Sequence, residues 1–180
     1  MLSRKGLNMS DEFKITLAQL NATVGDLSGN NQKVMEAWEI ARDERSDLIA
    51  FPEMFITGYN PQDLILKTAF QKAATSSIEQ IATACSQGPA IAIGGPFCDD
   101  DKLYNSYYIL ADGKIQAVIK KHHLPNEEVF DEVRLFSSGN VDGPFQIGKM
   151  RIGSPICEDA WHTDIVETLA ETGAQTLLVP

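Results

Sequence analysis

The sequence has no apolar run of membrane-spanning length, and its first residues, up to Glu12, lack the apolar stretch of a secretory signal. A soluble cytoplasmic protein is therefore predicted. Repeats and low-complexity segments are absent too, because the 13 Gly and 8 Pro are spread along the chain. With 43% hydrophobic residues among 180, one globular domain is expected from Phe13 to Pro180. Residues 1–12 are interpreted as a disordered or vector-derived leader.

Basic residues are scarce, with 15 Lys and Arg against 25 Asp and Glu, so the formal net charge is -10. The longest basic run is only Lys120 to His123. A charge of this sign repels nucleic acids and anionic membranes, so neither is expected as a partner. Cysteine is scarce as well, and the odd set Cys85, Cys98 and Cys157 is typical of reduced thiols rather than a disulfide framework.

The common cofactor motifs are missing. No Cys-x-x-Cys or His-x-x-x-His spacing occurs, and His122 and His123 are expected to point apart on a strand, so no metal site is predicted with them or with His162. A Gly-x-x-x-x-Gly-Lys phosphate loop and a Gly-x-Ser-x-Gly elbow are also absent. These patterns predict no cofactor on this chain and exclude a serine triad.

What the sequence does contain is an alternation of strands and helices. Strands are expected at residues 13–20, 48–51, 90–94, 104–110, 114–119, 145–147, 150–156 and 176–179. Three helices are expected: one with Val34, Ala37, Trp38 and Ala41 facing inward, one at 69–85, and one capped by Thr163, with an apolar stripe of Val166, Leu169 and Ala170 and a C-cap at Gly173.

Turn signals refine this pattern into an α/β fold. Residues 24–30 read as a loop, while Asp112-Gly113 and Gly148-Lys149 each join two predicted strands as hairpins. Hairpins bring antiparallel pairs into the sheet, so mixed sheets with helices outside are predicted.

Three reactive side chains are expected at the ends of buried strands. Cysteine is a strong nucleophile, so Cys157 can attack a carbonyl carbon while Glu53 takes its proton. The ammonium of Lys121 can stabilise the negative oxygen that develops during attack on an amide. Taken singly, each has a simpler explanation: a buried core thiol like Cys85 and Cys98, a solvated loop carboxylate, and a solvated lysine pair at a strand edge.

Together, the segments around these residues resemble the nitrilase, or carbon-nitrogen hydrolase, superfamily. The resemblance lies in 51–59, 121–126 and 156–161, which are similar to the glutamate, lysine and cysteine motifs of that family. Two further segments, 58–64 and 129–134, are similar to the N-terminal glutaminase domain of glutamine-dependent NAD synthetases. The likeness extends over nearly all of the chain from Phe13.

The resemblance implies an α-β-β-α sandwich that hydrolyses glutamine through a thioester on Cys157 and releases ammonia. Glu53 is then the general base and later the general acid, and Lys121 holds the oxyanion. Glu132 is expected to orient the lysine or the substrate, and the backbone N–H of Glu158 to help stabilise the tetrahedral intermediate.

One residue departs from the family pattern. Family members usually have an aromatic residue after Leu124-Pro125-Asn126, where this chain has Glu127. An aromatic ring there is expected to cover the glutamine site, so the carboxylate is expected to change substrate affinity.

The ending, Leu177 to Pro180, resembles a core strand after which family members continue, so the first domain is expected to be incomplete at its C-terminus. The resemblance places ATP, magnesium and deamido-NAD on a synthetase domain that this chain lacks, and it implies a homo-oligomer. Two alternatives stay open: another amidase of the superfamily, such as an ω-amidase or carbamoyl-amide hydrolase, and an inactive folded fragment that serves only in subunit contacts.

Overall fold

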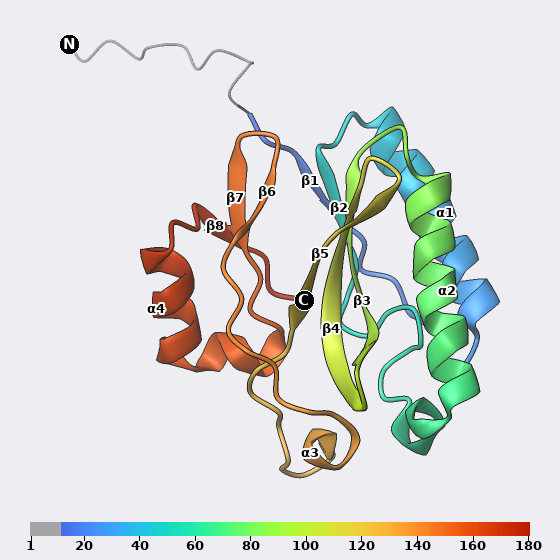
Figure 1. The fold of residues 1–180 in the computed structure, drawn as a ribbon. Coiled ribbons are helices and arrows are strands. Elements are labelled where there is room, and N and C mark those ends of the chain that lie inside the picture. The colour runs from blue at the N-terminus through green and yellow to red at the C-terminus, as the bar shows by residue number, and fades with distance from the viewer. Residues whose placement is uncertain (1–11) are drawn as a thin grey trace.

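The computed structural model describes residues 12–180, so the predicted leader lies outside it except for Glu12. Four layers follow one another across the molecule: helices α1 and α2, a five-stranded sheet, a three-stranded sheet, and helix α4 (Figure 1). This is the expected α-β-β-α arrangement with mixed sheets. Among the described helices, none has both the length and the apolar character needed to cross a membrane.

The five-stranded sheet combines parallel and antiparallel pairs. In spatial order it contains β1 (Ile15–Leu17), β2 (Leu48–Ala50), β3 (Ala90–Asp99), β4 (Lys102–Ala111) and β5 (Lys114–Lys120). The first three strands run parallel, whereas β3, β4 and β5 are paired antiparallel. The predicted hairpin between β4 and β5 is confirmed, with positive φ angles of 54° at Asp112 and 79° at Gly113. Strand β3 is longer than predicted because it forms a further hairpin with β4, turning at Asp100 with φ 52°.

Helices α1 (Leu27–Asp43) and α2 (Thr68–Ala84) cover one face of this sheet. The inward residues predicted for α1 are confirmed, since Val34, Trp38 and Ala41 are buried. The prediction of a loop at 24–30 is wrong for its second half, because α1 already begins at Leu27. The side chain of Asp26 accepts a hydrogen bond from the Gly29 N–H at 2.9 Å, and this cap outweighs the turn preference of the following residues.

The second sheet contains β6 (Phe145–Ile147), β7 (Met150–Gly153) and β8 (Thr176–Leu177), with α4 (Thr163–Glu171) outside it. Strand β6 has the predicted bounds, but the other two strands are shorter than predicted. Strand β7 ends at Gly153, and β8 ends at Leu177, before the exposed Val179. Thr163 is the first residue of α4 rather than its cap, which is His162. The helix buries Ile165 and Leu169 rather than a stripe that includes Val166 and Ala170.

Period-two alternation in the central strands separates two cores. Ile49, Ile91 and Ile93 face the helices, whereas Leu48, Ala50 and Ala92 face the second sheet, together with Ile152, Ile156 and Leu178 from that sheet and its connections. Burying one isoleucine or leucine side chain stabilises the fold by roughly 1.5–3 kcal/mol. The sandwich thus fixes the ends of β2 and β5 against the segment that follows β7, and these are the places where the predicted reactive residues lie.

Candidate active site

The predicted lysine and glutamate form a buried ion pair. Lys121, which follows β5, places its Nζ 2.7 Å from Oε1 of Glu53, which follows β2. The same Nζ lies 2.9 Å from Oε2 and 3.1 Å from Oε1 of Glu132, in the short helix α3 (Glu132–Leu135). The side chains of Lys121 and Glu132 are each only 1% exposed. Residues far apart in sequence therefore hold one ammonium between two carboxylates.

The turn that carries Glu53 depends on a close approach to β3. The Tyr107 hydroxyl donates to the Phe51 carbonyl at 2.7 Å and fixes the end of β2. A Cβ atom on Gly94 would meet the Met54 backbone nitrogen at 2.1 Å, so only glycine fits beneath the turn. Lys121 is fixed in turn by its backbone, since its N–H donates to the Asn105 carbonyl at 2.9 Å and its carbonyl accepts from Gly139 at 2.8 Å.

Two polar residues complete this network, and neither was predicted from its local sequence. Asn105, fully buried in β4, donates from Nδ2 to Oε1 of Glu53 at 2.7 Å and lies 3.4 Å from Oε1 of Glu132. The Tyr59 hydroxyl donates to the same Glu132 oxygen at 3.0 Å. The available signal for Asn105 was the polar pair Asn105-Ser106 among the apolar residues of β4. Lys121 and Asn105 both donate to the same oxygen of Glu53, Oε1.

Cys157 lies beside this network, although no strand delivers it directly. Four residues after β7, it opens the 3-10 helix η3 (Cys157–Trp161) with a φ angle of 46°. For a residue other than glycine this left-handed conformation is strained by about 1–3 kcal/mol. The buried Asp159 carboxylate holds the segment, accepting hydrogen bonds from the backbone N–H groups of Ile156 at 3.2 Å and His123 at 2.7 Å. It thereby ties the cysteine segment to the segment that follows Lys121.

The charges of the site keep the lysine ionised and the thiol protonated. Burial lowers the pKa of Lys121, but the charges of Glu53 and Glu132 outweigh it and raise that pKa above the usual lysine range. Burial, followed by the Glu53 charge, raises the pKa of Cys157, and the opposing effect of Lys121 does not reverse this. The Cys157 thiol is therefore neutral at rest, so it would need a base to become a strong nucleophile.

Burial and the Glu53 charge also raise the pKa of Glu132, although the ammonium of Lys121 acts in the opposite direction. Burial similarly raises the pKa of Tyr59, so the phenol stays neutral and acts as a donor to Glu132. The network is thus one cation held by two carboxylates and neutral donors.

The other two predicted binding residues do not reach the buried ion pair. Glu127 and Glu158 line a neighbouring open cavity of about 510 Å³ together with Glu128, His123 and His162. The side chain of Glu158, immediately after Cys157, is hydrogen-bonded through Oε1 to Nε2 of His162 at 3.2 Å. Three carboxylates around one cavity beside Cys157 favour a cationic group of a ligand there.

The remaining thiols differ from Cys157. Cys85 is buried, and burial raises the pKa of its thiol to about 11. Cys98 was grouped with buried thiols, but it is exposed, at the border of a second cavity of about 600 Å³ between α2 and the β3–β4 hairpin. The charge of an ammonium affects the pKa of Cys157, whereas the pKa of Cys85 is raised by burial and the Glu39 charge and that of Cys98 by burial.

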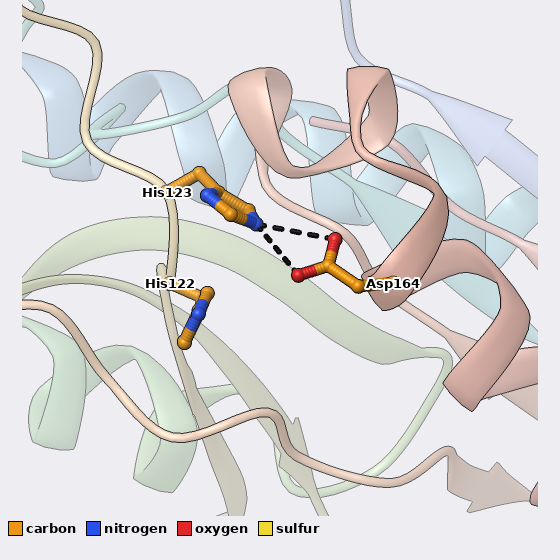
Figure 2. Close-up of side chains that lie close together, drawn as sticks. All are labelled: His122, His123 and Asp164. Carbon is orange, nitrogen blue, oxygen red and sulfur yellow. Dashed lines mark hydrogen bonds and ion pairs between the residues drawn. The ribbon is translucent and has the colours of Figure 1, made fainter.

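The expectation that His122 and His123 point apart on a strand is wrong. Strand β5 ends at Lys120, and the two rings come together edge to face with their centroids 4.7 Å apart. His123 also lies 3.1 Å from Asp164 at the start of α4 (Figure 2). The loop after β5 therefore brings together side chains that a strand would have separated.

Comparison with known proteins agrees with this geometry. A 49% identical relative, the glutamine-dependent NAD(+) synthetase of Rhodobacter capsulatus, matches over 96% of this chain and 31% of its own length. The glutamine-dependent NAD(+) synthetase of Thermotoga maritima is 39% identical over 83% of this chain and 26% of its own length. The chain thus spans about a third of the length of these relatives.

Solved structures share the fold. That of glutamine-dependent NAD+ synthetase from Acinetobacter baumannii, in complex with ADP, matches with a TM-score of 0.84 and 32% identity over 93% of this chain and 32% of the other. The NitN amidase of Neterenkonia sp. AN1 matches with a TM-score of 0.81 over 94% of this chain and 66% of the other, and at 23% identity it shows the fold alone. Residues 14–180 match the family model described as Carbon-nitrogen hydrolase. The chain therefore belongs to the carbon-nitrogen hydrolase family.

Proposed function

We propose that this chain hydrolyses the side-chain amide of glutamine through a thioester on Cys157. The observation that carries the proposal is the placement of Cys157 next to the buried ammonium of Lys121 and its carboxylate partner Glu53. Glutamine is the amide of choice because relatives at 49% and 39% identity are named glutamine-dependent.

The first half of the reaction forms the thioester. Glu53 takes the proton of the Cys157 thiol as sulfur attacks the amide carbon, and the carbonyl oxygen becomes negative. Lys121 stabilises that oxygen, and the backbone N–H of Glu158 adds a second donor. Glu53 then gives its proton to the amide nitrogen, the carbon–nitrogen bond breaks, and ammonia leaves.

The second half releases glutamate. Glu53, ionised again, takes a proton from water as the water oxygen attacks the thioester carbon. The intermediate collapses with the carbon–sulfur bond broken, and the proton on Glu53 returns to the sulfur. Because Glu53 works on a neutral thiol in the first half and on water in the second, its second oxygen must stay accessible throughout.

The acidic cavity beside Cys157 binds the other end of the substrate. Glu158 and Glu127 are placed to attract the α-ammonium group of glutamine, while the amide points toward Cys157. An aromatic residue at 127 would cover the substrate; Glu127 instead adds charge at an exposed rim, so binding through this residue weakens with added salt.

Ammonia is the useful product in this proposal. A synthetase domain beyond this chain would use it with ATP and magnesium to amidate deamido-NAD to NAD, and the protein would act in the cytoplasm as a homo-oligomer. The longer relatives named glutamine-dependent NAD(+) synthetase support this division of labour. A general superfamily amidase is the competing function, and it predicts hydrolysis of other small amides as fast as glutamine.

The test compares two variants that each remove one thiol. Cys157→Ala should reduce glutamate release from glutamine to the uncatalysed level, whereas Cys98→Ala should leave it unchanged. In the protein that includes a synthetase domain, Cys157→Ala should abolish NAD formation from glutamine and preserve formation from ammonia. Loss of both would contradict the division of labour, and a wild-type protein without glutaminase activity would mark an inactive fragment.

A further inference from the structure

A cluster of side chains outside the proposed catalytic network has the composition of a metal site. His122, His123 and Asp164 each offer one ligand atom, and these atoms lie within 4.8 Å of one another (Figure 2). Two imidazoles and one carboxylate are a ligand set that zinc uses in proteins, with water in the fourth position. The three residues are called the histidine cluster below.

The two histidines are held in place before any ion binds. The Asp159 carboxylate accepts from the backbone N–H of His122 at 3.2 Å and of His123 at 2.7 Å, which fixes consecutive residues of the loop. Nδ1 of His122 lies 2.7 Å from the Gly139 carbonyl. A ring N–H given to a carbonyl leaves the lone pair on the other nitrogen, Nε2, and metal-binding histidines are commonly oriented in this way.

Spacing around His123 suits two ligands of one ion. Its Nε2 lies 3.1 and 3.2 Å from the two carboxylate oxygens of Asp164. Bonds of 2.0–2.2 Å at a tetrahedral angle separate two zinc ligands by roughly 3.3–3.5 Å. An ordinary hydrogen bond has a similar length, so the third ligand distinguishes the two interpretations. The ligand atom of His122 lies within 4.8 Å of those of His123 and Asp164.

The neighbouring His162 serves as an internal reference. Its ring is stacked on that of His123, with centroids 3.7 Å apart and planes at 15°, and its Nε2 is engaged with Glu158. Imidazole ligands bind a metal in the plane of the ring, so a stacked ring presents its face and not a lone pair to the ion. His162 is therefore a histidine of the same neighbourhood that should not be a ligand.

We propose that the histidine cluster binds one divalent cation of the zinc class. The ion would join the loop that follows Lys121 to helix α4, and thus to the segment that begins at Cys157. Asp164 is exposed enough to admit it, and the net charge of -10 attracts cations. Imidazole ligands favour zinc, copper or nickel over magnesium and calcium, which prefer oxygen. The proposal does not depend on the glutaminase function.

The test is a calorimetric titration of the chelator-treated, desalted protein with zinc chloride. Cys98→Ser and Cys157→Ser are introduced together as the background, because accessible thiols also bind zinc. One ion per chain is expected, with no saturable binding of magnesium. Loss of a hydrogen-bond partner of a ligand costs ~10–100-fold in affinity, so loss of a ligand through His123→Ala or Asp164→Asn should weaken binding at least about 100-fold.

The matched control is His162→Gln in the same background, which should change the affinity by less than about threefold, since it removes no ligand. Asp164→Asn keeps the shape of an exposed side chain, so it reports on binding even if His123→Ala disturbs folding. Absence of saturable zinc binding would overturn the proposal, as would equal affinity in the Asp164→Asn variant. An equal loss in His162→Gln and His123→Ala would overturn the ligand assignment.

Discussion

Two adjacent lysines at the end of β5 lie in opposite environments. Lys120 is partly exposed, pairs with Asp99 at 2.7 Å, and places its Nζ over the rings of Tyr104 and Phe97 at 4.4 and 5.0 Å. Lys121 is 1% exposed and pairs with two carboxylates, one of them equally buried. A surface pair contributes about 0–1 kcal/mol, whereas breaking a buried pair costs about 3–5 kcal/mol. The same residue type therefore lies in a surface ion pair at one position and in the proposed catalytic network at the next.

The largest expected effect comes from Lys121→Met, which should abolish glutamine hydrolysis. It also leaves the buried Glu132 without its cation, so the free energy of unfolding should fall by about 3–5 kcal/mol near neutral pH. Denaturant unfolding followed by circular dichroism measures this loss.

The pH dependence of this loss has a defined sign. Without Lys121 the pKa of Glu132 rises further, because the ammonium was the main influence lowering it. A carboxyl group whose pKa is raised by folding costs no stability below its unfolded pKa; the cost grows as the pH rises from the unfolded to the folded pKa and is constant above it. The deficit of Lys121→Met should therefore shrink on acidification, and a deficit that grows at low pH would contradict the ionic origin.

Glu53→Gln should lower the rate of glutamine hydrolysis by about 10²–10⁴-fold, the range of general-base catalysis. The same change removes a negative charge that raises the pKa of Cys157, so the pKa of the thiol should fall and the thiolate fraction should increase. Thiolate absorbance titrated against pH measures this shift. A larger thiolate fraction together with slower turnover would indicate that Glu53 transfers protons and does not act only through its charge. An unchanged or raised thiol pKa would contradict the claim that the Glu53 charge raises the pKa of Cys157.

Asn105→Leu should lower kcat by about 10–100-fold with little change in KM, because a hydrogen bond to a charged group contributes about 1.5–3 kcal/mol. Asn105 acts through Glu53 as a positioning residue. The adjacent Ser106 is a matched control: it is equally buried, and its Oγ has no hydrogen-bond partner among the described residues. Ser106→Ala should leave kcat unchanged, and equal losses in both variants would indicate general disruption of β4.

The smallest effect is expected for Lys120→Met, which should reduce the free energy of unfolding by less than about 1 kcal/mol and leave kcat unchanged. A loss of activity comparable with that of Lys121→Met would remove the distinction between the two lysines. Thermal unfolding and a glutaminase assay at the same salt concentration are sufficient measurements.

Local sequence predicted the elements and the three reactive residues, but not the register that joins them. Asn105 meets Glu53 because β4 lies beside β3 and because the Lys121 N–H donates to the carbonyl of Asn105. Such contacts across strands have no local pattern. Edge strands were predicted too long for the same reason. The alternation of apolar residues suggested a strand at 13–20, but the paired strand β1 is only Ile15–Leu17.

The path of the backbone after a strand ends was the second feature that the sequence did not predict. His122 and His123 were expected to separate as strand neighbours do, yet they lie beyond β5, where Asp159 holds both backbone N–H groups. Cys157 was expected directly at a strand end, and instead a connection from Gly153 turns it into η3 with a positive φ. In both places a buried side chain, rather than a periodic pattern, determines the backbone path.

The most direct measurement is the site of covalent labelling by a glutamine analogue that carries an electrophile in place of its amide. Peptide mapping by mass spectrometry at increasing times should find the adduct on Cys157 well before Cys98, although Cys98 is the more exposed thiol, and excess glutamine should slow only the Cys157 adduct. Equal labelling of both cysteines, without protection by glutamine, would contradict a glutaminase site built from Lys121, Glu53 and Cys157.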